Sequence, residues 1–234
     1  DADAKHATII ADTITVGDGT GSADAIVTLG DASKAANAVL GDAASQITLN
    51  SDAKVVFQGS GSGNAVLNGA LVSANGALLD FTSGSGTLNV KGTAEKLNIN
   101  VADNKAAVVN LAKQTDVLSI QAGKIDLQNS GAAFTLAKGT LDLGSEVVLT
   151  NTTNSGGTFT VNSGATLQAN SSVIKSFVTE DTNPADKAGK FALSGTWSLT
   201  GENNDLAGIA ITGASGSLIK GTNVAVSTAM TGAS

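Results

Sequence analysis

Short units of alternating aliphatic and polar residues recur along almost the whole chain, and this alternation strongly limits the possible folds. Each unit places two apolar residues two positions apart, so both lie on one face of a β-strand. Glycine, asparagine, serine and aspartate, which tolerate tight-turn backbone, separate the units. The apolar pairs are Ile14/Val16, Val27/Leu29, Ile47/Leu49, Val55/Phe57, Leu79/Phe81, Leu88/Val90, Leu97/Ile99, Val109/Leu111, Leu118/Ile120, Ile125/Leu127, Phe134/Leu136, Leu141/Leu143, Val147/Leu149, Phe159/Val161 and Ala165/Leu167. The chain is therefore expected to form many short strands with one buried face each.

The spacing of these units indicates how the strands are arranged. From residue 81 onward, the second apolar residue recurs mostly every six to twelve residues, and two or three steps give the length of one solenoid coil. A β-sandwich has similar strand spacing. Short strands and interchangeable aliphatic residues favour coils that stack on near copies of themselves. We expect an all-β fold with a parallel β-solenoid (a right-handed β-helix) over most of the chain; β-sandwich domains are the alternative.

The composition predicts a narrow core made of aliphatic side chains. Apolar residues make up 41% of the 234 residues, yet aromatic residues make up only 3% and Trp197 is the only tryptophan. There are 28 glycines. Such a chain has enough apolar residues to fold, and its core is expected to consist mainly of Val, Leu, Ile and Ala.

Two segments depart from the strand pattern. Residues 31–45 are rich in alanine and are expected to form one or two helical turns, a wider loop or a capping element. Residues 178–190 contain the only proline, Pro184, and no alternating unit. We therefore divide the chain into a β-solenoid over residues 1–177, a loop or boundary over 178–190, and a carboxy-terminal β cap or small β subdomain over 191–234.

The charged residues exclude some classes of partner. The formal net charge is −7, and all thirteen basic residues are lysine. This balance argues against a nucleic-acid partner and against docking on acidic lipids. The chain has no apolar run of transmembrane length and no cysteine. The chain starts at Asp1, as expected if a leader was removed or a fragment was expressed. The absence of cysteine together with the many small polar residues is typical of a secreted or bacterial cell-surface protein.

The residues predict no catalytic or cofactor site. His6 is the only histidine and lies outside any nucleophile motif. Asp126 and Asp142 occupy equivalent positions in two alternating units. If the two units lie on adjacent coils, these carboxylates approach the separation used by retaining glycosidases; two solvated acids are the alternative. We expect no catalytic residues and no enzyme activity.

One acidic stretch is a candidate metal site. Asp18 and Asp24 flank glycines in "DGTGSAD", and calcium is bound by several oxygen atoms on a flexible loop. The stretch matches neither an EF-hand loop nor the nonapeptide repeat of calcium-binding β-rolls. Calcium, held by Asp18 and Asp24, is the only cofactor considered, and an Asp/Gly turn is the alternative.

Three stretches resemble a known family. Residues 86–101 ("GTLNVKGTAEKLNINV"), 139–151 ("GTLDLGSEVVLTN") and especially 156–170 ("GGTFTVNSGATLQAN") are similar to the passenger repeats of bacterial autotransporter adhesins. The resemblance covers about residues 46–175. It implies a right-handed parallel β-helix displayed on the cell surface, often for adhesion, and it implies no catalytic residue. The composition also resembles that of self-assembling surface-layer proteins.

These observations lead to a non-enzymatic, extracellular, structural or adhesive β-solenoid as the expected function. A surface-layer or fibre subunit joined by strand pairing between subunits is the alternative, and a polysaccharide-processing β-helix enzyme is a second alternative. The expected partners are copies of itself, neighbouring subunits, or a host or bacterial cell surface.

Overall fold

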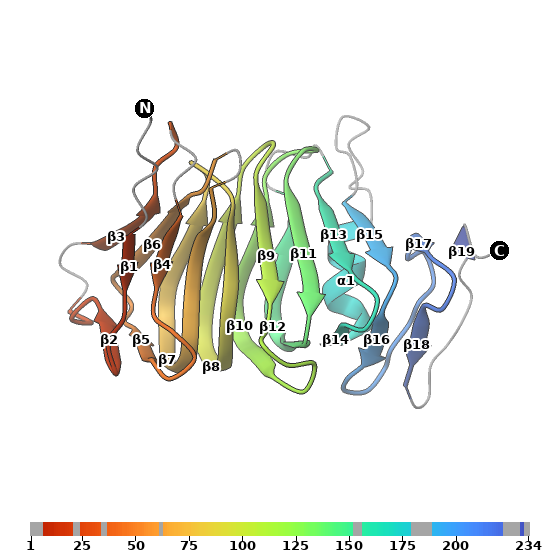
Figure 1. Cartoon of the computed structure of the whole chain (residues 1–234). Helices are drawn as coiled ribbons and strands as arrows, with labels where there is room; N and C mark the ends of the chain where they lie inside the picture. Colours follow the sequence, from red (N-terminus) through yellow and green to blue (C-terminus); the bar gives the residue numbers. More distant parts are fainter. Residues whose placement is uncertain are drawn as a thin grey trace.

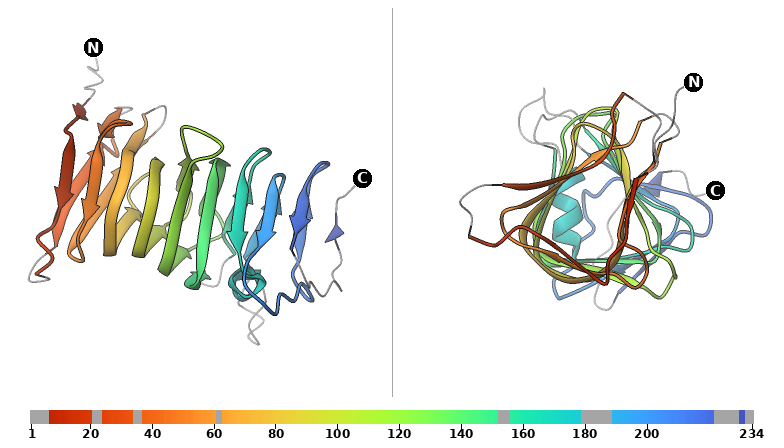
Figure 2. Two further views of the ribbon diagram at one scale, coloured as in Figure 1. Left: turned by 90° about the horizontal axis from the view of Figure 1, so that it is seen from below. Right: turned by 60° about the vertical axis from the view of Figure 1, so that its left-hand side comes forward.

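The computed structural model describes residues 7–20, 24–33, 37–60, 63–151, 156–178, 189–221 and 230–231. Strands account for 61% of the structure and wind into a parallel β-solenoid of about seven turns. Figure 1 shows the coils stacked from the amino-terminal to the carboxy-terminal end, and Figure 2 shows them from below and nearly end-on. The pairings between the named strands are parallel, whereas a sandwich built of hairpins has antiparallel pairs. The predicted β-solenoid is confirmed.

Within the described residues, the coils up to residue 150 contribute strands to three faces and the later coils to two, and each face is a parallel ladder. The first face contains β1 (Ala7–Ile9), β4 (Ala38–Leu40), the starts of β7 (Ala65–Phe81) and β8 (Gly86–Val101), β9 (Ala106–Asn110), β11 (Ala133–Lys138), β13 (Thr158–Val161), β15 (Lys190–Leu193), β17 (Ile211–Gly213) and β19 (Met230–Thr231). The second face contains β2 (Thr13–Val16), β5 (Gln46–Leu49), the middle of β7 and β8, the starts of β10 (Val117–Leu127) and β12 (Thr140–Thr150), β14 (Thr166–Ala169), β16 (Thr196–Leu199) and β18 (Leu218–Lys220). The third face contains β3 (Ala25–Gly30), β6 (Ala53–Gln58) and the ends of β7, β8, β10 and β12.

The inward residues of successive coils stack in columns that form one continuous core. Phe159 lies opposite Phe134 on one side and Phe191 on the other, with ring centroids 5.0 Å and 6.0 Å apart. Phe57 and Phe81 stack nearly parallel, with centroids 4.1 Å apart. Burying one such side chain contributes about 1.5–3 kcal/mol, so every added coil stabilises the coil below it.

The stretch "GGTFTVNSGATLQAN" (156–170) confirms the predicted alternation in detail. Phe159 and Val161 of β13 and Leu167 of β14 are fully buried, whereas Thr158 and Thr166 are half-buried. The N–H of Ala165 donates to the carbonyl of Asn162 at 3.0 Å and closes the turn between the two strands. β13 and β14 are therefore two sides of one coil, on the first and second faces.

Several strands turn a corner of the coil without ending, because glycine allows the required backbone. In β8, Gly92 has φ +129°, and a Cβ added there would lie 2.2 Å from the carbonyl oxygen of Leu71. Gly92 is aligned with Leu71 on one neighbouring coil and Leu118 on the other. The chains of adjacent coils therefore approach too closely at this corner for any side chain.

A helix replaces a strand on the third face after β12, and the sequence did not predict it. Helix α1 (Ser171–Val178) buries Val173, Ile174 and Phe177 against β12 and β15. The side chain of Asn170 caps it by accepting the N–H of Ser172 at 2.9 Å. Apolar positions three and four apart in "VIKSF" are the available helix signal. Within the described residues, no helix has the length and apolar character needed to cross a membrane.

The predicted departures from the strand pattern have mixed outcomes. Residues 31–45 include β4, so the predicted helical turns are wrong where the structure describes them: the inward Ala38 and Leu40 align with Ala65 and Leu67 of the next coil. Residues 34–36 and most of the predicted boundary at 178–190 lie outside the described residues. Strands β15 to β18 continue the ladders of β13 and β14. Residues 190–220 therefore continue the same solenoid.

Replacing Gly92 with alanine tests the close approach at this corner. We expect Gly92→Ala to lower the free energy of unfolding by about 2–4 kcal/mol, because it adds backbone strain and a collision with the Leu71 carbonyl. The matched control is Gly216→Ala, which has φ +90° but no heavy atom within 4 Å of the added Cβ, and which we expect to cost about 1 kcal/mol. Urea denaturation followed by circular dichroism measures both; equal losses would contradict the close approach.

Candidate functional site

The candidate calcium residue Asp18 lies in a turn that the protein itself holds in place. One carboxylate oxygen of Asp18 accepts the N–H and the hydroxyl of Thr20, at 2.8 Å and 2.7 Å. The carboxylate of Asp52, one coil further, accepts the N–H of Asp18 at 3.0 Å and of Gly19 at 2.9 Å. The hydrogen bonds from Gly19 and Asp18 lower the pKa of the Asp52 carboxyl. Asp52 therefore joins the turn after β2 to the next coil.

Asp24 lies at the start of β3, where its side chain is exposed, and residues 21–23 between it and the turn lie outside the described residues. Within the described part of the chain, no three His, Cys, Asp or Glu side chains gather closely enough to hold a metal ion. The assignment of calcium to Asp18 and Asp24 stays a prediction.

Asp126 and Asp142 do not form the carboxylate pair that the sequence offered as a candidate, and Asp126 is buried rather than solvated. Asp126 follows the corner of β10 and is aligned with Asn100 on the third face. Asp142 precedes the corner of β12 and is aligned with Ser119 on the second face, whose hydroxyl donates to it at 2.8 Å. The two carboxylates therefore lie on different faces of the solenoid and do not form a glycosidase pair.

The third face has a row of polar residues that includes two unexpectedly buried carboxylates. Asp80, Asn100 and Asp126 are aligned on successive coils, and coils are about 4.8 Å apart. Asp80 and Asp126 are only 6% and 3% exposed, although their side chains point away from the core. Lys54 lies 2.8 Å from the carboxylate of Asp80, and Lys124 lies 3.0 Å from that of Asp126. Each buried carboxylate is thus neutralised by a lysine, which favours a structural role for the row.

Two opposing effects act on the carboxyl group of Asp80. Burial raises its pKa, but hydrogen bonds from Lys54 and Thr82 outweigh burial, and the pKa lies below the ordinary value of 3.8. A carboxylate with a lowered pKa stabilises the folded state above its unfolded-state pKa, and this contribution is lost as the pH falls through the folded-state pKa. Asp80 therefore contributes its full stabilisation at neutral pH.

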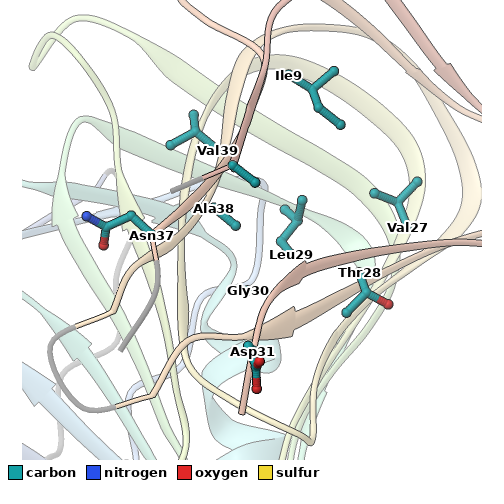
Figure 3. Close-up of a pocket in the computed structure, with 10 residues that line it drawn as sticks. Ile9, Val27, Thr28, Leu29, Gly30, Asp31, Asn37, Ala38 and Val39 are labelled. Atoms are coloured by element: carbon teal, nitrogen blue, oxygen red, sulfur yellow. The ribbon is translucent and has the colours of Figure 1, made fainter. Parts of the chain in front are cut away.

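A cavity lies at the amino-terminal end of the described residues, and Figure 3 shows its lining. The cavity has a volume of about 220 Å³ and lies between β1, β3 and β4. Ile9, Val27 and Leu29 surround the same space (Figure 3). The lining includes one acid, Asp31, whose carboxylate accepts the N–H and the hydroxyl of Ser33 at 2.8 Å and 2.6 Å. The cavity therefore offers mainly apolar contacts to a bound group.

This cavity lies where the inner columns reach the first described coil. Ile9 stacks over the buried Leu40 in the same column, yet Ile9 is 59% exposed because its other side faces no described strand. Ile10 and Ile26 of the same coil are 60% and 58% exposed. We call Ile9, Ile10, Ile26 and Val27 the amino-terminal end surface. For Ile9 and Val27 the sequence pattern missed it because alternation predicts that inward residues are buried, whatever coil they belong to, whereas Ile26 is aligned with the outward Lys54.

The carboxy-terminal end also has uncovered apolar residues. Ile219 of β18 stacks over the fully buried Trp197 and is itself only partly buried. Leu218 is 50% exposed, and Lys220 beside it is exposed. We call Leu218, Ile219 and Lys220 the carboxy-terminal end surface.

The ion pair of the buried polar row can be tested by removing one lysine. At pH 7, we expect Lys54→Met to lower the free energy of unfolding by about 1–3 kcal/mol, because Asp80 loses its cation while it stays buried. The difference in stability between the wild type and Lys54→Met should shrink below pH 3.8, because there the wild type loses the contribution of Asp80. Thermal unfolding of both proteins at a series of pH values measures this difference.

The matched control is Lys91→Met. Lys91 is half-exposed and lies 3.7 Å from Asp116, and such pairs contribute less than about 1 kcal/mol. If the two variants lose the same stability, or if the gap for Lys54→Met does not depend on pH, Asp80 is not held by Lys54 in the proposed way.

Comparisons of this chain with protein-family models, with curated proteins and with solved structures found no match.

Proposed function

We propose that this protein is a non-enzymatic structural and adhesive rod on the surface of a bacterial cell. The observation that carries the proposal is the single core that runs through all described coils, with polar side chains in ordered rows outside it. Every described coil is hydrogen-bonded to its neighbours along the axis, so that bending the rod requires breaking a ladder. A rod of this kind displays side chains at fixed intervals and at a distance from its point of attachment.

The outward rows are suited to broad, polar contact with another surface. On the second face Thr140, Thr166 and Thr196 are aligned on successive coils, and all three are half-buried. On the first face the pair Thr135 and Thr160 is flanked in its column by Val108 and Ala192, so this short row is not part of the proposed contact. Regular rows of hydroxyl groups at the coil spacing of about 4.8 Å form many individually small hydrogen bonds to a polymer or a cell surface. This is an adhesive surface rather than a pocket for a small ligand.

The composition and the resemblance to autotransporter passengers favour the same location. A chain with no cysteine and with a net charge of −7 stays soluble and resists non-specific association outside the cell. The enzyme alternative has lost its main candidate, because Asp126 and Asp142 lie on different faces. The polysaccharide-processing alternative therefore loses the one carboxylate pair that was considered for it.

The cell-surface location is tested with antibodies raised against the purified chain. We expect these antibodies to label intact, unpermeabilised cells of the source organism, and brief protease treatment of intact cells to remove the signal. An antibody against a cytoplasmic protein is the control for cell integrity. Labelling that appears only after permeabilisation would rule out the proposed location.

The adhesive surface is tested with beads coated with the protein. We expect the variant Thr140→Ala/Thr166→Ala/Thr196→Ala to reduce the number of cells bound per bead several-fold without changing the circular dichroism spectrum, since these hydroxyls point away from the core. Thr135→Ala/Thr160→Ala is the matched control on the first face. Equal binding by the wild type and the second-face variant would show that this row of threonines is not the adhesive surface.

A further inference from the structure

The chain contains two asparagine–glycine pairs, Asn68-Gly69 and Asn75-Gly76, and one aspartate–glycine pair, Asp18-Gly19. In such a pair the backbone nitrogen of the glycine can attack the side-chain carbonyl carbon of the residue before it, because glycine has no Cβ to hinder the approach. The two asparagines have almost the same neighbours, in "LNGA" and "ANGA". A difference in their reactivity must therefore come from the fold.

The fold holds the aspartate–glycine pair in an unreactive arrangement. The N–H of Gly19 donates to the carboxylate of Asp52 at 2.9 Å. One oxygen of the Asp18 carboxylate accepts the N–H and the hydroxyl of Thr20. The two groups that would have to meet are both engaged in other contacts, so this pair is protected from attack.

The first asparagine–glycine pair lies inside a ladder. Asn68 is aligned with Asn89 of the next coil and Gly69 with Val90. Asn68 is half-buried and Gly69 is buried. On the preceding coil, the carbonyl oxygen of Ser45 would lie 2.6 Å from a Cβ added to Gly69. The backbone of Gly69 is therefore packed between two coils and has no room to rotate toward the side chain before it.

The second pair lies at a corner of β7 where the ladders are interrupted on both sides. Toward β8 the register shifts between Asn75 and Ala77, so that within the described residues Gly76 has no aligned residue. Toward the preceding coils, the pairing with β5 ends at Ala74 and the pairing with β6 begins at Leu78. Asn75 is exposed and Gly76 is half-buried. The ladders therefore constrain this pair less than the first one.

The space around Gly76 also differs from that at other corners. Gly76 has φ +97°, and the nearest heavy atoms to an added Cβ belong to Ser51, at 3.6 Å. At the corner glycines Gly92 and Gly123, a backbone carbonyl oxygen of the neighbouring coil lies 2.2 Å and 2.1 Å from the added Cβ. The backbone of Gly76 is therefore in ordinary contact with its neighbours and can move without a collision.

We propose that Asn75 is a site of spontaneous deamidation in the folded protein. The backbone nitrogen of Gly76 forms a bond to Cγ of Asn75, the bond from Cγ to Nδ2 breaks, and the proton of the attacking nitrogen leaves with the amino group as ammonia. The product is a five-membered succinimide ring. Water then adds to one of its two carbonyl carbons and opens the ring, giving aspartate or isoaspartate. Water is the only co-reactant, and no group is oxidised or reduced.

The corner accommodates both products. Asn75 is aligned with Lys96 of the next coil, and both are exposed, so the new carboxylate lies beside a cation. Isoaspartate adds one carbon atom to the main chain at a position where the register already shifts. Each reaction makes the chain one unit more negative than its formal net charge of −7. We therefore expect acidic forms of the protein that stay folded.

The test follows the whole chain during days of incubation at mildly alkaline pH. Anion-exchange chromatography separates the acidic forms, and peptide mass spectrometry locates the modified asparagine. In the folded wild type we expect Asn75 to react several-fold faster than Asn68. In wild type unfolded by urea the two should react at similar rates, because their neighbours in the sequence are alike. The circular dichroism spectrum of the purified acidic form should match that of the unmodified protein.

One substitution in each pair completes the test. Asn75→Gln should lower the rate at which acidic forms appear several-fold, because the longer side chain closes the corresponding ring much more slowly. The matched control Asn68→Gln should leave that rate unchanged. Equal rates at Asn75 and Asn68 in the folded protein would overturn the proposal, as would acidic forms of Asn75→Gln appearing at the wild-type rate. A folded wild type that stays unmodified while the urea-unfolded chain reacts would also overturn it.

Discussion

The hydrogen-bonded ladder between successive coils is the interaction on which the rest of this structure depends. It aligns residues of one coil with residues of the next, and this alignment places apolar side chains in columns. The column through Phe134, Phe159 and Phe191 shows the result: three successive coils each contribute one aromatic ring to it. Backbone pairing and core packing therefore reinforce each other at every coil.

The ladder also sets what happens at the corners and on the outside. Adjacent coils approach so closely at Gly92 that a side chain is excluded, and a carboxylate such as Asp52 uses the same proximity to hold the turn of the preceding coil. On the third face Asp80 and Asp126 are buried, and each is paired with a lysine. Loops of different length are accepted because only the strands have to align: Val66 is aligned with Thr87, whereas Thr158 is aligned with Lys190.

The strands and the inward residues could be predicted from alternation because a strand exposes every second side chain to the same environment. This holds for β13 and β14, where Phe159, Val161 and Leu167 are buried as expected. Prediction failed where tertiary contacts override the local pattern. The segment Ser171–Val178 forms a helix because its apolar residues, including Ile174 and Phe177, close the third face there. Ala38–Leu40 is extended in an alanine-rich segment because β1 and β7 pair with it on both sides.

The sequence by itself determined that this chain forms short strands with a narrow aliphatic core, because the alternation and the turn residues are local properties. Only the tertiary structure decided which strands become neighbours, because the partner of each strand lies a whole coil away and the coils differ in length. That difference placed Asp126 and Asp142 on separate faces, although their local sequences are alike. It also decided that Ile9 is exposed while Leu40, in the same column, is buried, since burial depends on a coil above and a coil below.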